Sequence, residues 1–129
     1  MKKLLALLFS ILILPFSVYA SDVYYCSDNN NIGFDLAKNF KVTDFKYRKF
    51  KILIDFEKKN VISETIFMYK DSVTECIFDN YSKTLYCIGE YGTAFSINKN
   101  TLNFARGEIY IEENKDDDYT LAYGTCEKF

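Results

Sequence analysis

Short runs of alternating apolar and polar residues recur along this chain, and they constrain its fold more than any other feature. The clearest run covers residues 49–57, where Phe50, Ile52, Ile54 and Phe56 share one face. Alternation with a period of two is typical of a β-strand with one buried face. No long segment has a helical period, so the crossover helices that a parallel sheet requires are missing. The sequence therefore predicts antiparallel pairing.

The number of such runs predicts an all-β protein: a small antiparallel β-barrel or sandwich of about eight to ten short strands. The other expected strands are residues 22–26, 61–69, 73–79, 84–88 and 119–126, with three more between 93 and 111. The segment 31–47 is ambiguous, because Ile32, Phe34 and Leu36 alternate as in a strand, whereas Leu36 and Phe40 could line a short helix.

Four cysteines occur, at Cys26, Cys76, Cys87 and Cys126. An even count in an exported chain predicts two disulfides. A hairpin over residues 73–88 places Cys76 opposite Cys87 on one strand face, so we expect these two to be joined. Cys26 and Cys126 would then link the first strand to the last. A four-thiolate metal site is not expected, because such sites use close C-x-x-C pairs.

A second register follows from residues 93–111. We expect Asn98–Thr101 to form a hairpin loop and Arg106–Gly107 to form a two-residue turn, which gives three strands with one apolar face. The expected facing pairs are Ile97 with Leu102, Phe95 with Phe104, Phe104 with Ile109, and Leu102 with Ile111.

The N-terminal residues 1–20 have the three parts of a secretory signal. Lys2 and Lys3 precede an apolar run over residues 4–14, and small residues stand before a cleavage point after Ala20. The apolar run barely reaches the length that spans a bilayer. We expect removal of this segment, a single disulfide-bonded β domain over residues 21–129, a periplasmic or secreted location, and no stable membrane anchor.

The composition excludes several chemistries. The chain has no histidine, so Ser-His-Asp and Cys-His catalysis and histidine-held zinc or haem are excluded. Its formal net charge of −2 argues against nucleic-acid binding. A carboxylate pair could cleave a glycoside, but no spacing selects such a pair. We expect neither an enzyme nor a bound cofactor.

Three features could mark a binding site, and each has a plainer structural explanation. The 12 Phe and 11 Tyr residues could line a cavity or fill a core. A cluster of cations could face anionic lipid, peptidoglycan or polysaccharide, or form a solvated strand face. The acidic segment 112–118 could hold calcium or form a solvated loop. The clustered cations are Lys38, Lys41, Lys46, Arg48, Lys49, Lys51, Lys58 and Lys59.

The motifs Tyr24-Tyr25-Cys26 and Gly124-Thr125-Cys126-Glu127-Lys128-Phe129, with the hairpin from Phe95 to Phe104, resemble a group of small, secreted, uncharacterised bacterial proteins. Those proteins run from Y-x-C near the mature start to a G-x-C-x-K end, which implies a compact exported domain. The Tyr25-Cys26 start is also similar to periplasmic inhibitors of c-type lysozyme. Their Ser-Gly-x-x-Tyr loop has no counterpart here, since the chain contains no Ser-Gly.

Together these features predict a non-catalytic secreted or periplasmic module that binds a protein or an envelope polymer. The alternative is a lipocalin-like carrier of a small apolar ligand. The two differ in where apolar surface lies. A carrier needs an internal void lined by aromatic side chains, whereas a binding module has a filled core and an exposed patch.

Overall fold

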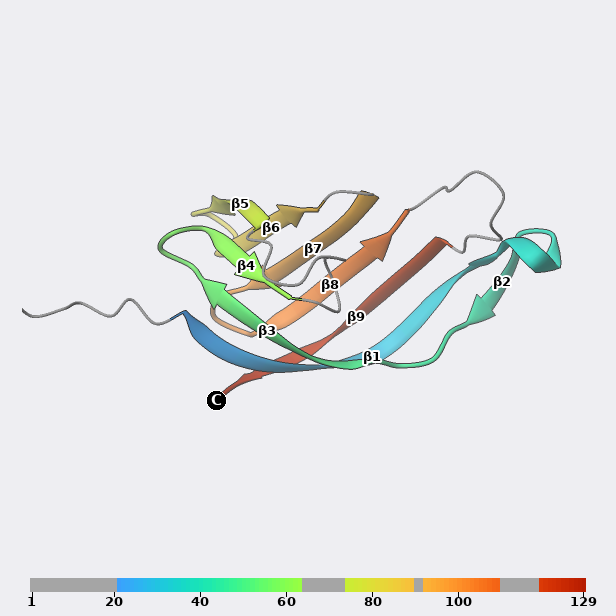
Figure 1. Ribbon diagram of the computed structural model, residues 1–129, viewed down its shortest axis with the longest axis horizontal. Helices are drawn as coiled ribbons and strands as arrows, with labels where there is room; N and C mark the ends of the chain where they lie inside the picture. The colour runs from blue at the N-terminus through green and yellow to red at the C-terminus, as the bar shows by residue number, and fades with distance from the viewer. Residues whose placement is uncertain (1–20, 64–73, 90–91, 110–118) are drawn as a thin grey trace, which may run out of the picture.

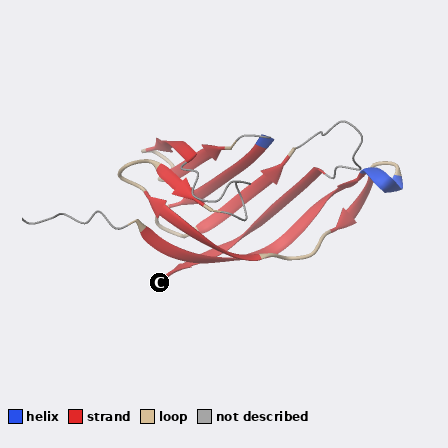
Figure 2. Cartoon of the chain, viewed as in Figure 1, coloured by secondary structure: helices blue, strands red, loops and turns tan. Residues whose placement is uncertain are grey.

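The computed structural model describes residues 21–63, 74–89, 92–109 and 119–129 (Figure 1). Most of these residues form strands and the turns between them, and helical structure is short (Figure 2). The strands are β1 (Asp22–Asp35), β2 (Lys41–Asp44), β3 (Lys49–Asp55), β4 (Asn60–Ile62), β5 (Thr74–Asp79), β6 (Thr84–Ile88), β7 (Thr93–Asn98), β8 (Asn103–Glu108) and β9 (Tyr119–Lys128), and the 3-10 helix η1 covers Leu36–Lys38.

The strands form an antiparallel barrel with one additional strand. Each strand from β3 to β8 pairs with the next along the chain, and β1 closes the ring by pairing with both β3 and β9. β2 extends the sheet from the far end of β1. The predicted all-β class is confirmed. The ambiguous segment 31–47 contains the end of β1, then η1 and then β2.

β1 changes its inward face part-way along its length. A β-bulge interrupts its pairing with β9 between Asp28 and Asn30. Before the bulge Cys26 and Asp28 are buried, and after it the buried positions continue at Asn31. A bulge inserts one extra residue, so the side chains beyond it exchange faces. Ile32 therefore points outward and is 39% exposed.

The predicted hairpin around the second disulfide is confirmed. β5 and β6 pair with Cys76 opposite Cys87 and Phe78 opposite Leu85. The Cys76–Cys87 disulfide joins the two strands, with a Cα–Cα distance of 4.3 Å. The hairpin turn follows Asp79, whose carboxylate accepts backbone hydrogen bonds just beyond the strand.

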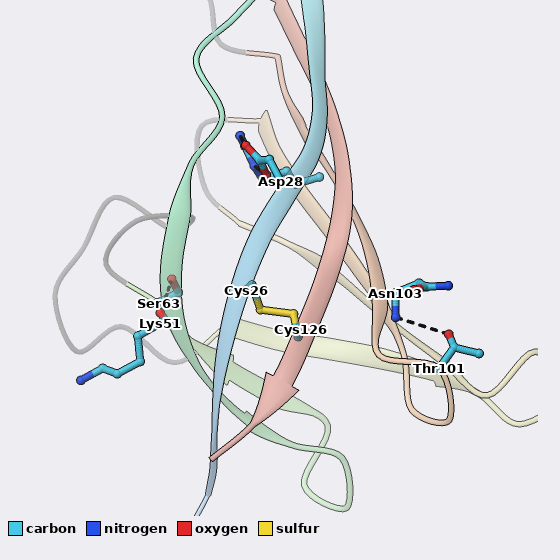
Figure 3. The surroundings of a disulfide bond; sticks show 8 residues. Cys26, Asp28, Lys51, Ser63, Thr101, Asn103 and Cys126 are labelled. Carbon is cyan, nitrogen blue, oxygen red and sulfur yellow. Dashed lines mark hydrogen bonds and ion pairs between the residues drawn. A yellow bond between two sulfur atoms is a disulfide. The ribbon is translucent and has the colours of Figure 1, made fainter.

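The predicted link between the first and last strands is also confirmed. Cys26 and Cys126 lie directly opposite each other on β1 and β9 and are disulfide-bonded, with a Cα–Cα distance of 4.0 Å (Figure 3). No cysteine is free. Two disulfides are consistent with an oxidising compartment.

The expected pairing between β7 and β8 is wrong by two residues. Phe104 faces Ile97 instead of Phe95, and Phe95 faces Arg106. The cause is Leu102, which adopts a left-handed backbone conformation (φ 57°) and so belongs to the loop. Asn98 accepts hydrogen bonds from the loop through its side chain. A shift of two residues preserves the inward face, so Phe95, Ile97 and Phe104 are buried as expected.

The expected turn at Arg106–Gly107 is also wrong, because β8 continues through both residues to Glu108. Arg106 points inward and is 1% exposed, whereas Ile109 is 65% exposed and does not join the core. The turn was expected because it would place Phe104 opposite Ile109 and Leu102 opposite Ile111, but a buried arginine with charged partners holds the inward position instead. The expected position of Ile111 lies outside the described residues.

The apolar core fills the interior between β1, β3 and the hairpins. Phe104 stands at its centre, with ring centroids 5.3 Å from Phe50 and 5.7 Å from Phe95. Gly124 makes room for this ring, because a Cβ atom there would lie 2.8 Å from it. The buried apolar members are Tyr24, Cys26, Phe50, Ile52, Ile54, Val61, Leu85, Cys87, Phe95, Ile97, Phe104 and Cys126. Of the expected strand 61–69, the structure describes only residues 61–63. The first two belong to β4, and Ser63 follows it.

Candidate functional site

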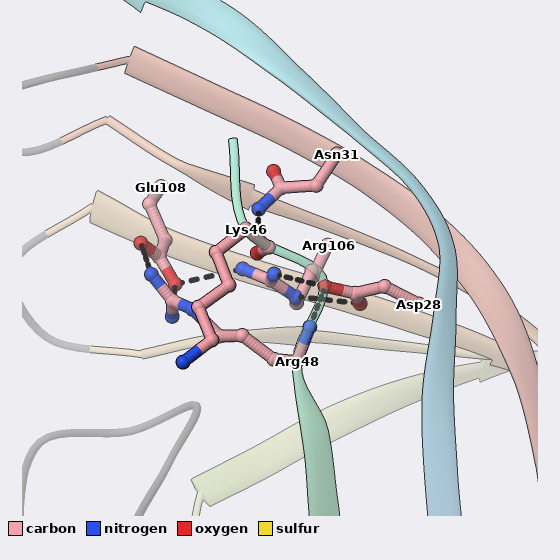
Figure 4. A network of polar contacts seen from close by, with 6 residues as sticks. All are labelled: Asp28, Asn31, Lys46, Arg48, Arg106 and Glu108. Atoms are coloured by element: carbon pink, nitrogen blue, oxygen red, sulfur yellow. Dashed lines mark hydrogen bonds and ion pairs between the residues drawn. The ribbon is translucent and has the colours of Figure 1, made fainter. Parts of the chain in front are cut away.

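The interior contains a buried ion pair between Arg106 of β8 and Asp28 of β1 (Figure 4). Arg106 Nη2 donates to Asp28 Oδ2 at 2.7 Å and its Nε donates to Oδ1 at 3.3 Å. Both side chains are completely buried. A two-point contact of this kind matches the planar guanidinium fork to the carboxylate. The pair therefore fixes β8 against β1 across the interior.

Glu108 and Arg48 extend the pair into a network of four charged groups. Glu108 Oε1 accepts from Arg106 Nη1 at 2.9 Å and from Arg48 Nη1 at 2.6 Å. The Arg48 backbone N–H donates to Asp28 Oδ2 at 2.8 Å. Two cations and two anions balance, so each buried charge has a partner of opposite sign. This balance favours a structural role, because no charge is left over for a ligand.

The network lies where the chain leaves β2 for β3. Asn31 Nδ2 donates to the Lys46 carbonyl oxygen at 3.0 Å, which holds residues 45–48 against β1 (Figure 4). Two neighbouring buried atoms, Asn31 Oδ1 and Thr120 Oγ1, have no hydrogen-bond partner in the described structure. This network was not predicted, because Arg106 was expected in a turn and Arg48 in the cation cluster, and no local pattern singles out Asp28 or Glu108.

A surface cavity of about 360 Å³ lies at the other end of the barrel. Lys128 Nζ and Asp22 Oδ2 form an ion pair of 2.7 Å at this cavity, and the hydrogen bond raises the pKa of Lys128. Burial, together with the nearby Asp22, raises the pKa of Tyr24. The residues that line the cavity are Asp22, Tyr24, Ile54, Asp55, Phe56, Glu57, Lys99 and Lys128. The mixed charges make this a polar cavity, unlike an apolar carrier pocket.

Local hydrogen bonds tune two carboxyl groups, those of the buried Asp35 and the half-buried Asp79. The Lys38 side chain, 2.6 Å from Asp35, lowers the pKa of that carboxyl. The Ser82 hydroxyl, followed by the Tyr81 and Ser82 backbone amides, lowers the pKa of Asp79. Both carboxylates accept backbone hydrogen bonds at chain reversals, at the end of β1 and between β5 and β6.

The predicted cation cluster is divided among several environments. Lys38 pairs with Asp35, Arg48 with Glu108, and Lys58 lies 3.9 Å from Asp55. Lys49 and Lys51 are exposed on the outer face of β3, whereas Lys41 lies on β2. Lys46 belongs to the link before β3, and Lys59 to the turn before β4. The cluster is therefore not one surface, although Lys49 and Lys51 share the exposed face of β3.

The expected acidic loop over residues 112–118 lies outside the described residues. Within the described ranges, no group of three or more potential ligands is placed to hold a metal ion. The same part of the chain contains no helix with the length and apolar character needed to cross a membrane.

The outer surface carries an apolar patch that we call the outer apolar face. Strand register places Phe34 beside Val42, Ile32 beside Leu121, and Tyr123 beside Ala105. Leu121 and Val42 are each 61% exposed and Tyr123 is 56% exposed. The face consists of Ile32, Phe34, Val42, Ala94, Ala105, Gly107, Leu121 and Tyr123, from strands β1, β2, β7, β8 and β9.

This face was not predicted as a unit. Its residues alternate with inward residues as in any strand, and sequence alone does not show which strands bring their outward residues together. The β1 bulge turns Ile32 and Phe34 outward, and the closure of the barrel places β9 beside them. Large exposed apolar patches on soluble proteins mark interaction sites.

Comparison with known proteins gives no family to which this chain can be assigned. No family model matches it, and no curated protein or solved structure is similar enough to count as a match.

Proposed function

We propose that this protein is a non-catalytic secreted or periplasmic binding module that docks a partner protein on its outer apolar face. The observation that carries the proposal is the composition of that face. It combines large exposed side chains, such as Leu121, Tyr123 and Phe34, with small ones at Ala105 and Gly107. None of its residues is charged, and depletion of charge with enrichment of aromatic residues is typical of interface centres.

The shape of the face favours a protein over a small molecule. Gly107 and Ala105 of β8 lie beside Leu121 and Tyr123, and Ala94 of β7 lies beside Gly107. The large side chains therefore border a shallow depression formed by small residues. Such relief suits complementary packing with a few projecting anchors, which supply most of the energy in protein interfaces. Asp44, opposite Ile32 on β2, begins a polar border.

The packing of the interior argues against the carrier alternative. Ile52, Leu85 and Ile97 have no exposed surface, and the Phe104 ring contacts its neighbours. Arg106 and Asp28 occupy a further part of the described interior with paired charges. A carrier of an apolar ligand would need an apolar void in place of these contacts.

The test compares substitutions on and off the face. A partner captured from the envelope of the producing organism would be identified, purified and titrated against the protein by calorimetry. We expect Leu121→Ser with Tyr123→Ser to weaken binding by about tenfold or more. Ile77→Ser, which removes an even more exposed apolar side chain from β5, should leave affinity unchanged.

If the partner bound the Leu121→Ser/Tyr123→Ser variant as tightly as the parent protein, the outer apolar face would not be the docking surface. Binding of a fluorescent fatty acid at one molecule per chain, unaffected by both sets of substitutions, would support the carrier alternative instead.

A further inference from the structure

A separate groove lies on the outer surface where β3, β1 and β9 meet, over the Cys26–Cys126 disulfide. Its volume is about 490 Å³. Strand register places Lys51 beside Tyr25 and Lys49 beside Ser27, and Thr125 flanks Ser27 on the other side. The Lys51 side chain extends away from the barrel (Figure 3). The groove is therefore built from neighbouring positions on rigid strands.

The groove is positively charged on a protein whose formal net charge is −2. Lys49 and Lys51 are both exposed and lie on the same face of β3. Neither makes an ion pair with any described residue. The one carboxylate in the lining is Glu127, which lies across Tyr25 from Lys51. The Lys49 side of the groove instead carries the hydroxyls of Ser27 and Thr125, which can donate hydrogen bonds to an anion.

An aromatic wall stands beside these cations. Tyr25 is 52% exposed, and its ring packs edge-to-face on Phe129 with centroids 5.8 Å apart. The Phe129 contact orients the Tyr25 ring and leaves about half of the residue accessible. An aromatic ring with a hydroxyl at its tip presents an apolar face and a polar edge together, which suits a flat ligand with both characters.

We propose that this groove binds an acidic saccharide. The anionic group lies between Lys49, Lys51 and the Ser27 hydroxyl, and the sugar ring packs on Tyr25. Charge complementarity selects an anion, and the exposed aromatic wall selects a ring over a bare ion. The site is distinct from the outer apolar face, so it goes beyond the proposed function and does not depend on it.

The experiment titrates the full disulfide-bonded protein with a hyaluronan hexasaccharide, which carries carboxylates, and with the uncharged chitin hexamer. Binding is followed by calorimetry and by amide NMR shifts. We expect the acidic hexamer alone to bind, with the largest shifts at Tyr25, Ser27 and residues 49–51. Lys49→Gln with Lys51→Gln should weaken binding about tenfold or more, whereas Lys41→Gln, a matched change on β2, should have no effect.

A further variant separates ring recognition from charge recognition. Tyr25→Ala should weaken the binding of the hyaluronan hexasaccharide and leave the binding of inorganic phosphate unchanged. The proposal is overturned if the neutral hexamer binds equally well, if Lys41→Gln weakens binding as much as the groove variant, or if millimolar hyaluronan produces no shifts in the groove. Thermal unfolding of each variant confirms that it is folded.

Discussion

The two ends of the barrel interior exclude water equally well but by different means. At one end Ile52 and Leu85 have no exposed surface and pack by shape alone. At the other end Arg106 and Asp28 are as deeply buried and are held by directional hydrogen bonds. Apolar burial is proportional to area and tolerates small changes in shape. A buried ion pair fails as a unit when one member is lost.

This difference suggests separate roles for the two regions. The apolar region supplies most of the favourable burial, because it holds nearly all of the described core. The charged network connects three parts of the chain that are distant in sequence: the β1 bulge, the segment before β3, and β8. The following substitutions test whether the two regions respond as these roles require.

The largest effect is expected from Arg106→Met. This change fills similar space but leaves the Asp28 carboxylate buried without its guanidinium partner, which should lower the free energy of unfolding by about 3–5 kcal/mol. Adding Asp28→Val should recover at least half of the loss, since neither charge then remains alone. Urea unfolding of the parent, both single variants and the double variant gives the coupling energy. Simple additivity would contradict the paired role.

A smaller and graded effect is expected in the apolar region. Phe104→Leu removes part of a ring that contacts Phe50 and Phe95, and should lower the free energy of unfolding by about 1–1.5 kcal/mol. The same urea series measures it. Lys99→Ala in the preceding loop is the control, and should stay within about 0.5 kcal/mol of the parent. A loss from Phe104→Leu as large as that from Arg106→Met would remove the contrast between the two regions.

The smallest effect concerns pH. The Lys38 side chain lowers the pKa of Asp35 in the folded protein, so the ionised carboxylate stabilises the native state above the ordinary Asp pKa of about 3.9. That contribution is lost as the pH falls through the lowered value. Asp35→Asn should therefore flatten the acid side of the curve of stability against pH. Phe104→Leu should lower the whole curve without changing its acid slope, and an unchanged slope in Asp35→Asn would show that the carboxylate contributes nothing.

Much of the fold could be predicted from short-range patterns. The Cys76–Cys87 register followed from the hairpin loop, and the Cys26–Cys126 pair followed by exclusion. The β7–β8 register failed because Leu102 takes a left-handed conformation, which a bulky apolar residue rarely adopts. Alternation preserved the inward face even there, so the core residues of β7 and β8 were identified despite the wrong pairing.

The polar interior could not be predicted for a related reason. Arg106 falls at an inward position of β8, but a turn at Arg106–Gly107 was expected because it would have paired Phe104 with Ile109 on one apolar face. Its partner Asp28 lies 78 residues away, and no local pattern connects the two. The outer apolar face likewise depends on the β1 bulge and on contact between strands from the two ends of the chain, which only the closed barrel reveals.

The pairing of β1 with β9 has a kinetic consequence. These strands lie at opposite ends of the described chain, and their disulfide joins residues separated by 100 positions. Contacts of such long range must overcome a large loop-closure entropy and are typical of slowly folding β proteins. β1 cannot acquire this neighbour until the last strand has been synthesised, so the ring closes only when the whole domain is available. Until then the edge of β1 that β9 will cover stays open to pairing with other chains, which makes the half-made protein the stage most prone to aggregation.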